Sequence, residues 1–298
     1  MSILIPTHNR PDYVKIALKS AMEQSYENIE IIISDNSDGT ATQMVLEEQI
    51  GRDARVIYLK QSGGGYMENW LNALSHAHGE YVNFLMDDDL FHPQKIERML
   101  HYYTSYAEIG LVTSFRQLID AQGALLPSIE GTHPLYDVDT VISGTSLCEF
   151  MLKKGQNLVG EPTTVMIRRS DIGASFGQFC GRQYPVLADL ATWMELLHGR
   201  HCVYISDALS YLRMHDGQDQ RKKLTILKAN IDWLQLLCDG HEYGKYIVDG
   251  DEFRAVLTTK LASFVPFVAS QYEDIRNEDV DVEAIQCLIR KSLHLLLQ

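Results

Sequence analysis

The sequence predicts an α/β fold: an open sheet flanked by helices in the N-terminal part, followed by an all-helical C-terminal extension. Three observations predict it. Short apolar runs alternate with helix-like segments over residues 2–90, in the order of βαβ units. Each of three such runs ends in a polar loop, and beyond about residue 217 only helical periodicity remains.

The first strand covers residues 2–6, an apolar run that ends in a proline. Pro11 follows where it can open a helix. The same patterns predict helix 12–25, strand 29–33, helix 40–50, strand 55–59, helix 66–78, strand 81–85, helix 93–106 and strand 110–115. After an irregular stretch at 116–159 they predict strand 163–167, helix 189–197, strand 203–206 and helices 220–238, 251–270 and 282–297. We therefore expect two domains, 1–216 and 217–298.

Composition indicates a folded protein, because 45% of the 298 residues are hydrophobic and 22% are charged. The net charge of -14 disfavours binding to nucleic acid or to an anionic membrane surface. Five widely spaced cysteines without a CxxC pair are typical of buried thiols in a reducing compartment. No apolar run approaches the ~20 residues that span a bilayer. We expect a cytoplasmic location, with peripheral association at the inner face of the membrane left open.

The strongest chemical feature is the run Asp87-Asp88-Asp89, which directly follows an apolar strand. Ligands of open α/β sheets bind at the carboxyl ends of strands, so the loops after the first strands should converge there. A divalent cation would relieve the repulsion among the three carboxylates, and Mg²⁺ or Mn²⁺ would complete its shell with phosphates and water. The alternative is a solvated acidic turn before a helix, with Asp89 as its cap.

Four segments occur together in an order and approximate spacing that resemble glycosyltransferase family 2. They are Ile5-Pro6-Thr7-His8-Asn9-Arg10, Ser34-Asp35-Asn36-Ser37-Asp38, Gly79-Glu80-Tyr81 and the acidic run. The resemblance covers nearly all of residues 2–90. It implies the GT-A fold, a nucleotide-binding α/β domain with a continuous mixed sheet, and transfer of a sugar from a nucleotide diphosphate donor with inversion at the anomeric carbon.

The resemblance also implies roles for residues near the nucleotide. The loop after the first strand brackets the nucleotide in such enzymes, which corresponds to Pro6, Thr7 and Asn9. The acid after the second strand bonds the base, which corresponds to Asp35. An ionised carboxylate can accept the imide N–H of uracil or thymine, and of the two we expect a UDP-sugar as the donor. A helix N-cap is the alternative role of Asp35.

In the acidic run the resemblance assigns the ribose to Asp87 and the metal to Asp88, with Mn²⁺ or Mg²⁺ as the cofactor. The family's usual string has an acid where this chain has Met86, so Asp89 remains a second candidate metal ligand. Late in the domain, Tyr211-Leu212-Arg213-Met214-His215 resembles a motif that returns to the donor. Arg213 would there contact the diphosphate and His215 the metal.

Residues 187–194 resemble the segment that carries the family's general base, an acid followed four residues later by tryptophan. That makes Asp189 the base and Trp193 a packing residue on the sugar side of the site, although Ala188 stands where many relatives have glutamate. A helix N-cap is the alternative for Asp189. Glu161, between a glycine and a proline, could bond sugar hydroxyls or belong to an ordinary turn.

The predicted function is metal-dependent, inverting transfer from a UDP-sugar to a hydroxyl of a glycan, a lipid-linked acceptor or a protein. A nucleotidyltransferase is the first alternative. Such enzymes usually carry a glycine-rich loop directly after the first strand, whereas the corresponding segment Pro6–Arg10 contains no glycine. A degenerate nucleotide-sugar-binding module is the second. The C-terminal helices carry leucine stripes that we expect to dock on the catalytic domain or to form a homodimer contact. Their 13 acidic against 10 basic residues argue against a polybasic lipid anchor.

Overall fold

The computed structural model describes residues 1–129, 131–173, 175–215, 223–271 and 280–298. Their contacts divide the chain into two units. The first unit comprises residues 1–144, 157–176 and 199–215, and the second comprises 145–156, 177–198 and 216–298. The predicted boundary at 216/217 lies outside the described residues. The second unit also takes two segments from the middle of the chain, one of which carries Asp189.

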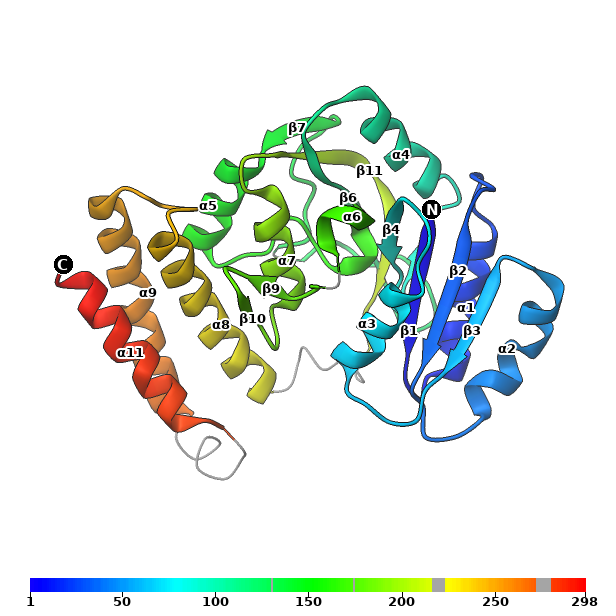
Figure 1. Ribbon diagram of the computed structural model, residues 1–298, viewed down its shortest axis with the longest axis horizontal. Coiled ribbons are helices and arrows are strands. Elements are labelled where there is room, and N and C mark those ends of the chain that lie inside the picture. The colour runs from blue at the N-terminus through cyan, green and yellow to red at the C-terminus, as the bar shows by residue number, and fades with distance from the viewer. Residues whose placement is uncertain (130, 174, 216–222, 272–279) are drawn as a thin grey trace. The chain divides into compact units, whose positions relative to one another are not determined.

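The first unit is built on one sheet, in which the described strands are ordered β3-β2-β1-β4-β8-β6-β11-β5, with β7 beside β11 (Figure 1). The strands are β1 (Ser2–Thr7), β2 (Glu30–Asp35), β3 (Val56–Lys60), β4 (Tyr81–Phe84), β5 (Leu90–Phe91), β6 (Ile109–Ile119), β7 (Thr140–Ser143), β8 (Met166–Arg168) and β11 (His201–Arg213). β1 is parallel to both β2 and β4, whereas β8 is antiparallel to β4 and β6. The continuous mixed sheet that the resemblance implies is therefore present.

Helices flank the sheet and bury both of its faces. They are α1 (Pro11–Met22), α2 (Ala41–Arg52), α3 (Tyr66–Ser75), α4 (Lys95–Ser105), α6 (Arg169–Ile172) and the 3₁₀ turn η1 (Pro162–Thr164). Ile3 and Ile5 of β1 belong to one apolar cluster with Val14 and Leu18 of α1. Leu4, which points to the opposite face, is also fully buried. Burial on both faces explains why these strands are continuous apolar runs.

The predicted elements of the first 90 residues are present with ends shifted by a few residues. Pro11 is the first residue of α1, as predicted. The largest differences lie in the middle of the chain. β6 continues to Ile119, and the stretch predicted as irregular contains helix α5 (Gly144–Lys154). Predicted strand 163–167 is a 3₁₀ turn followed by the short strand β8.

The second unit is mainly helical. Besides α5 it contains the hairpin β9 (Gln178–Phe179) and β10 (Arg182–Gln183), and helices α7 (Ala188–Leu197), α8 (Lys223–Glu242), α9 (Gly250–Ser270) and α11 (Val282–Leu296). The three last helices contact one another, and the leucine stripe of α8 is buried at Leu227, Leu234 and Leu237. The first residues of predicted helix 220–238 lie outside the described part. Among the described helices none is long and apolar enough to cross a membrane.

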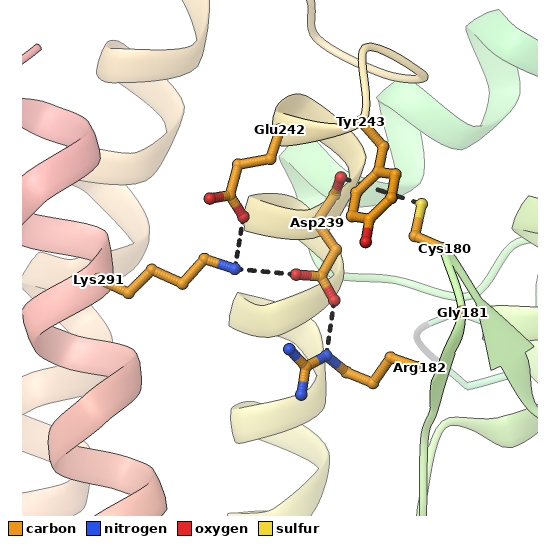
Figure 2. Close-up of a pocket in the computed structure, with 7 residues that line it drawn as sticks. All are labelled: Cys180, Gly181, Arg182, Asp239, Glu242, Tyr243 and Lys291. Atoms are coloured by element: carbon orange, nitrogen blue, oxygen red, sulfur yellow. Dashed lines mark hydrogen bonds and ion pairs between the residues drawn. The ribbon is translucent and has the colours of Figure 1, made fainter.

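Asp239 of α8 is the centre of a polar network in the second unit (Figure 2). Asp239 is 2% exposed. Its carboxylate accepts hydrogen bonds from Arg182 Nε at 2.8 Å, Tyr184 Oη at 2.7 Å and Lys291 Nζ at 3.0 Å. These donors come from β10, the segment after it and α11. Burial favours a raised pKa, but the hydrogen bonds from Tyr184 and Lys291 hold the pKa of Asp239 below its ordinary value. The network lines a pocket of about 580 Å³.

Replacing Asp239 by Ala should lower the stability of the chain by about 2–3 kcal/mol, because the buried hydroxyl of Tyr184 loses its acceptor and Arg182 and Lys291 each lose one anionic partner. The midpoint of urea unfolding, followed by far-UV circular dichroism, measures the loss. The matched control is Glu242→Ala, which removes the more exposed partner of Lys291 and should cost under about 1 kcal/mol. Equal midpoints for the two variants would contradict the central role of Asp239.

Candidate active site

The loops that follow β1, β2 and β4 meet at one edge of the sheet, as predicted from the three polar strand ends. Asn9 N–H donates to Ser37 Oγ at 2.7 Å, and Asn9 Nδ2 donates to Asp38 Oδ2 at 2.8 Å. Asn9 has a positive φ of 55°, a conformation that asparagine tolerates better than most residues. Thr7 Oγ1 donates to Asp87 Oδ2 at 2.9 Å, which ties the β1 loop to the acidic run.

Pro6 lies in β1 opposite Ser34, and Thr7 lies opposite Asp35 at the ends of the two strands. The Asp35 side chain is fully buried. It accepts hydrogen bonds from Ser37 N–H at 2.8 Å and from Tyr58 Oη, with Lys60 Nζ at 3.3 Å. Burial acts to raise its pKa, but these donors hold the pKa below its ordinary value. Its oxygens therefore face protein donors, and its contact with a base stays a prediction.

Asp87 lies between Thr7 and Arg10. Arg10 Nη1 is 3.0 Å from Asp87 Oδ1 and 2.9 Å from Asp88 Oδ2. Asp87 is 6% exposed. Burial, followed by the charge of Asp88, raises the pKa of Asp87 to about 6 despite the neighbouring arginine. A negative charge at Asp87 is thus costly here unless a cation or a hydrogen-bond donor offsets it.

Asp88, in the loop after β4, and His215, just after β11, lie close together although they are far apart in the sequence. His215 Nε2 lies 3.0 Å from Asp88 Oδ2, and both side chains are about 10% exposed. Adjacent ligands of an octahedral ion with bonds of about 2.1 Å are also about 3 Å apart, so the pair fits one edge of a Mg²⁺ or Mn²⁺ shell. Within the described ranges, no group of three or more His, Cys, Asp or Glu is placed to hold an ion. An ion at this pair would therefore complete its shell with substrate oxygens and water.

Asp89 points into the unit and is 1% exposed. Its Oδ2 accepts from Thr163 Oγ1 at 2.5 Å, and its Oδ1 accepts from Arg213 N–H at 3.0 Å. Burial and the charge of Asp88 raise its pKa well above the ordinary value. This carboxylate joins the acidic loop to η1 and β11. The metal contact for which Asp89 was a second candidate stays a prediction.

Arg213 binds protein atoms, and its contact with a phosphate stays a prediction. It is 2% exposed, and its guanidinium donates to the backbone carbonyls of Asp88 at 2.7 Å and of Asp120 and Ala121 at 3.1 Å. Its guanidinium lies over the ring of Tyr13, 5.1 Å from the centroid, and that ring is 5.1 Å from the imidazole of His215. Arg213 thus holds the acidic loop in shape, whereas a phosphate contact was predicted for it.

Two further charged groups support the loops around this site. Glu161, the residue before η1, pairs with Arg116 Nε at 2.7 Å and keeps 23% of its side chain exposed. Lys95 of α4 is fully buried and donates to Thr164 O and Ser210 Oγ, both at 3.0 Å. Burial lowers the pKa of Lys95 well below its ordinary value. The turn that binds Asp89 is therefore fixed from both sides.

Asp189 lies in the second unit, in the first turn of α7, and is half-buried. Its Oδ1 accepts from the N–H of Leu190 at 2.7 Å. The segment before α7 is fixed by Asp232 of α8, which accepts from Val186 N–H and Leu187 N–H, both at 2.9 Å. Trp193 on the same helix is 1% exposed. This burial accords with packing, and the place of Trp193 on the sugar side of the site stays a prediction.

A helix N-cap was the alternative role for Asp35, Asp89 and Asp189, and it is wrong for all three. The N-cap residues are Thr40 for α2, Gln94 for α4 and Leu187 for α7. Sequence reasoning also missed three residues that organise the loops of the first unit, Arg10, Lys95 and Thr163, and one residue of the second unit, Asp232, which fixes the segment before α7. The one sequence signal that could have identified Arg10 is its place as the last residue of the first motif, Ile5–Arg10. The other three act through contacts distant in sequence.

Comparisons with known proteins agree with the motifs. The family described as Glycosyl transferase family 2 matches residues 2–137. TuaG of Bacillus subtilis, named as a teichuronic acid biosynthesis glycosyltransferase, is 29% identical over 231 residues, which are 76% of this chain and 84% of that protein. An uncharacterized glycosyltransferase of Rickettsia conorii is 35% identical over 270 residues. That match covers 89% of this chain, but only 42% of the relative's length.

A solved structure shares the fold. TarS 1-349 of S. aureus in complex with UDP aligns with a TM-score of 0.62 at 13% identity, covering 99% of this chain and 80% of that one. At this identity the likeness to TarS establishes the fold alone. The chain is a glycosyltransferase with the GT-A fold, and its residues 2–137 match the family model of glycosyl transferase family 2.

Proposed function

We propose that this chain transfers a sugar from a UDP-sugar to an acceptor hydroxyl, that the reaction needs Mn²⁺ or Mg²⁺, and that it inverts the anomeric centre. The observation that carries the proposal is the Asp88–His215 pair, with its 3.0 Å spacing, beside the loops that follow β1 and β2. A carboxylate and an imidazole at this distance would suit a divalent ion that takes its other ligands from the diphosphate of the donor and from water. The match of residues 2–137 to glycosyl transferase family 2 supports the reaction class.

The donor nucleotide would lie on the loops of the first unit. Asp87 takes the ribose, Thr7 and Asn9 border the nucleotide with Pro6, and Asp88 and His215 hold the ion. The complex of TarS with UDP supports uracil as the base. Because the oxygens of Asp35 already accept protein donors, we propose that it acts on the base through the shape of the loop 35–38. A direct hydrogen bond would require one of those donors to move.

The acceptor hydroxyl is activated by Asp189. Its carboxylate takes the hydroxyl proton while the oxygen attacks the anomeric carbon from the face opposite the diphosphate. The bond from that carbon to the diphosphate oxygen breaks, and UDP leaves with the bonding electrons. When bound, the divalent ion supplies positive charge to the leaving diphosphate. Displacement from the opposite face inverts the configuration of the sugar.

The acceptor would bind at the less regular part of the first unit. Glu161 is partly exposed and is oriented by Arg116, which suits hydrogen bonds to sugar hydroxyls. The name of TuaG refers to teichuronic acid biosynthesis, and this supports a glycan acceptor ahead of a lipid-linked acceptor or a protein. A cytoplasmic location, at the inner face of the membrane when the acceptor is lipid-linked, accords with this role.

Incubation of the chain with UDP-sugars and Mn²⁺ should release UDP, because sugar transfer or slow donor hydrolysis breaks the bond between the sugar and the diphosphate. Ion-exchange chromatography of the nucleotide products measures it. The matched control is the Asp88→Ala chain, which should release far less. Formation of UDP-sugar and pyrophosphate from UTP and a sugar phosphate would instead identify a nucleotidyltransferase. Binding of the donor without any turnover, with acceptor glycans present, would support the degenerate binding module.

A further inference from the structure

The guanidinium of Arg10 is the counter-ion of two carboxylates in the acidic run, those of Asp87 and Asp88. A single nitrogen, Nη1, lies 3.0 Å from Asp87 Oδ1 and 2.9 Å from Asp88 Oδ2. The same Asp88 oxygen is 3.0 Å from His215 Nε2. Arg10 is therefore bound to the oxygen that the proposed function gives to a divalent ion.

This oxygen cannot serve all three partners at once. A carboxylate oxygen has two lone pairs, and both are used by Arg10 and His215. Histidine can turn from a partner of the carboxylate into a ligand of the ion, because a neutral imidazole offers a lone pair. Arginine stays protonated and has no acceptor atom, so it repels a divalent cation about 3 Å away. When an ion binds at Asp88, Arg10 is the group that must leave.

The local structure permits such a movement. The backbone of Arg10 is fixed as the N-cap residue of α1, and its carbonyl accepts from Val14 N–H at 3.1 Å. Its side chain is 30% exposed, compared with 8% and 10% for the side chains of Asp87 and Asp88. A guanidinium that is displaced from carboxylates can instead bind a diphosphate strongly, through two parallel hydrogen bonds.

We propose that Arg10 is an exchangeable counter-cation of the donor site. In the free enzyme it offsets the charges of Asp87 and Asp88, and on donor binding it yields Asp88 to the divalent ion and moves to the diphosphate. The inference rests on the proposed function. It predicts that loss of the Arg10 charge strengthens the binding of the free ion and weakens the binding of the nucleotide, two effects of opposite sign.

Two titrations of the full chain test this. Mn²⁺ binding without nucleotide is followed by the loss of the free-ion signal in electron paramagnetic resonance, and UDP binding at saturating Mn²⁺ is followed by calorimetry. In Arg10→Gln, the dissociation constant of Mn²⁺ should fall about tenfold, because a charge repulsion is removed, and that of UDP should rise about tenfold. Arg10→Lys, which keeps the charge but lacks the planar fork, should bind Mn²⁺ as the wild type does and UDP at an intermediate level.

The matched control is Arg52→Gln, which removes the same charge from an exposed position on α2 and should change neither constant. If Arg10→Gln weakens both ligands or changes neither, Arg10 is only a structural residue and the inference is wrong. If the wild type binds neither Mn²⁺ nor UDP, the proposed function itself fails. Circular dichroism of each variant separates a misfolded chain from either result.

Discussion

Replacing Asp189 by Asn should reduce the kcat of sugar transfer by about 10²- to 10⁴-fold, the range for the loss of a positioned proton acceptor. The amide has the shape of the carboxylate but cannot take the proton of the acceptor hydroxyl. Donor binding should change little, because the base acts only in the transition state. Steady-state rates at saturating donor, together with calorimetric titration of UDP in Mn²⁺, measure the two effects separately.

The control for this variant lies on the same helix. Glu195→Gln removes an acid of α7 that is 46% exposed and pairs with Lys245, and it should retain near-normal kcat. An Asp189→Asn chain with the rate of the wild type would place the base elsewhere, with Glu161 as the next candidate. The anomeric configuration of the product, determined by NMR, gives an independent check, since retention would exclude direct displacement.

The N-terminal part of the fold could be predicted because its signals are local. Buried parallel strands are continuous apolar runs, Pro11 marks the start of α1, and the polar residues after the strands indicate the edge of the sheet at which their loops meet. Asp87 and Asp88 were predicted as site residues for that reason. Their burial and the contact of Thr7 with Asp87 then follow from the parallel pairing of β1 with β4.

The middle of the chain could not be predicted, since tertiary contacts decide its structure. β11 runs from His201 to Arg213, but its register with β6 shifts near Ile205 and Ala208, so its apolar alternation is interrupted. The segments 145–156 and 177–198 join the helical unit, which the linear order of motifs does not reveal.

Side-chain roles were hardest where a charged group is buried. Motif position alone suggested ligand contacts for Asp89 and Arg213, whereas both are less than 3% exposed and bind protein atoms. Buried charges need such partners, and those partners come from elements far away in the sequence. The acidic loop therefore depends on groups that a reading of its own residues does not identify.

The second large effect concerns Asp88. Asp88→Ala should remove the Mn²⁺-dependent part of UDP binding, with a loss of affinity of at least about 100-fold, more than the 10- to 100-fold typical for residues that only support a ligand. The reason is that one of two protein groups proposed to hold the ion is lost. Asp207→Ala is the matched control, since it removes an acid of β11 that is 70% exposed and pairs with Arg98, and it should bind UDP as the wild type does.

Calorimetric titration of UDP into the wild type, in Mn²⁺ and again in EDTA, tests the central claim most directly. We expect clear binding in Mn²⁺ and weak binding in EDTA, because the acidic run would face the diphosphate with like charge when no ion is present. In Asp88→Ala the two titrations should coincide at the weak value. Equal UDP affinity of the wild type in Mn²⁺ and EDTA would contradict a metal-dependent donor site at Asp88 and His215.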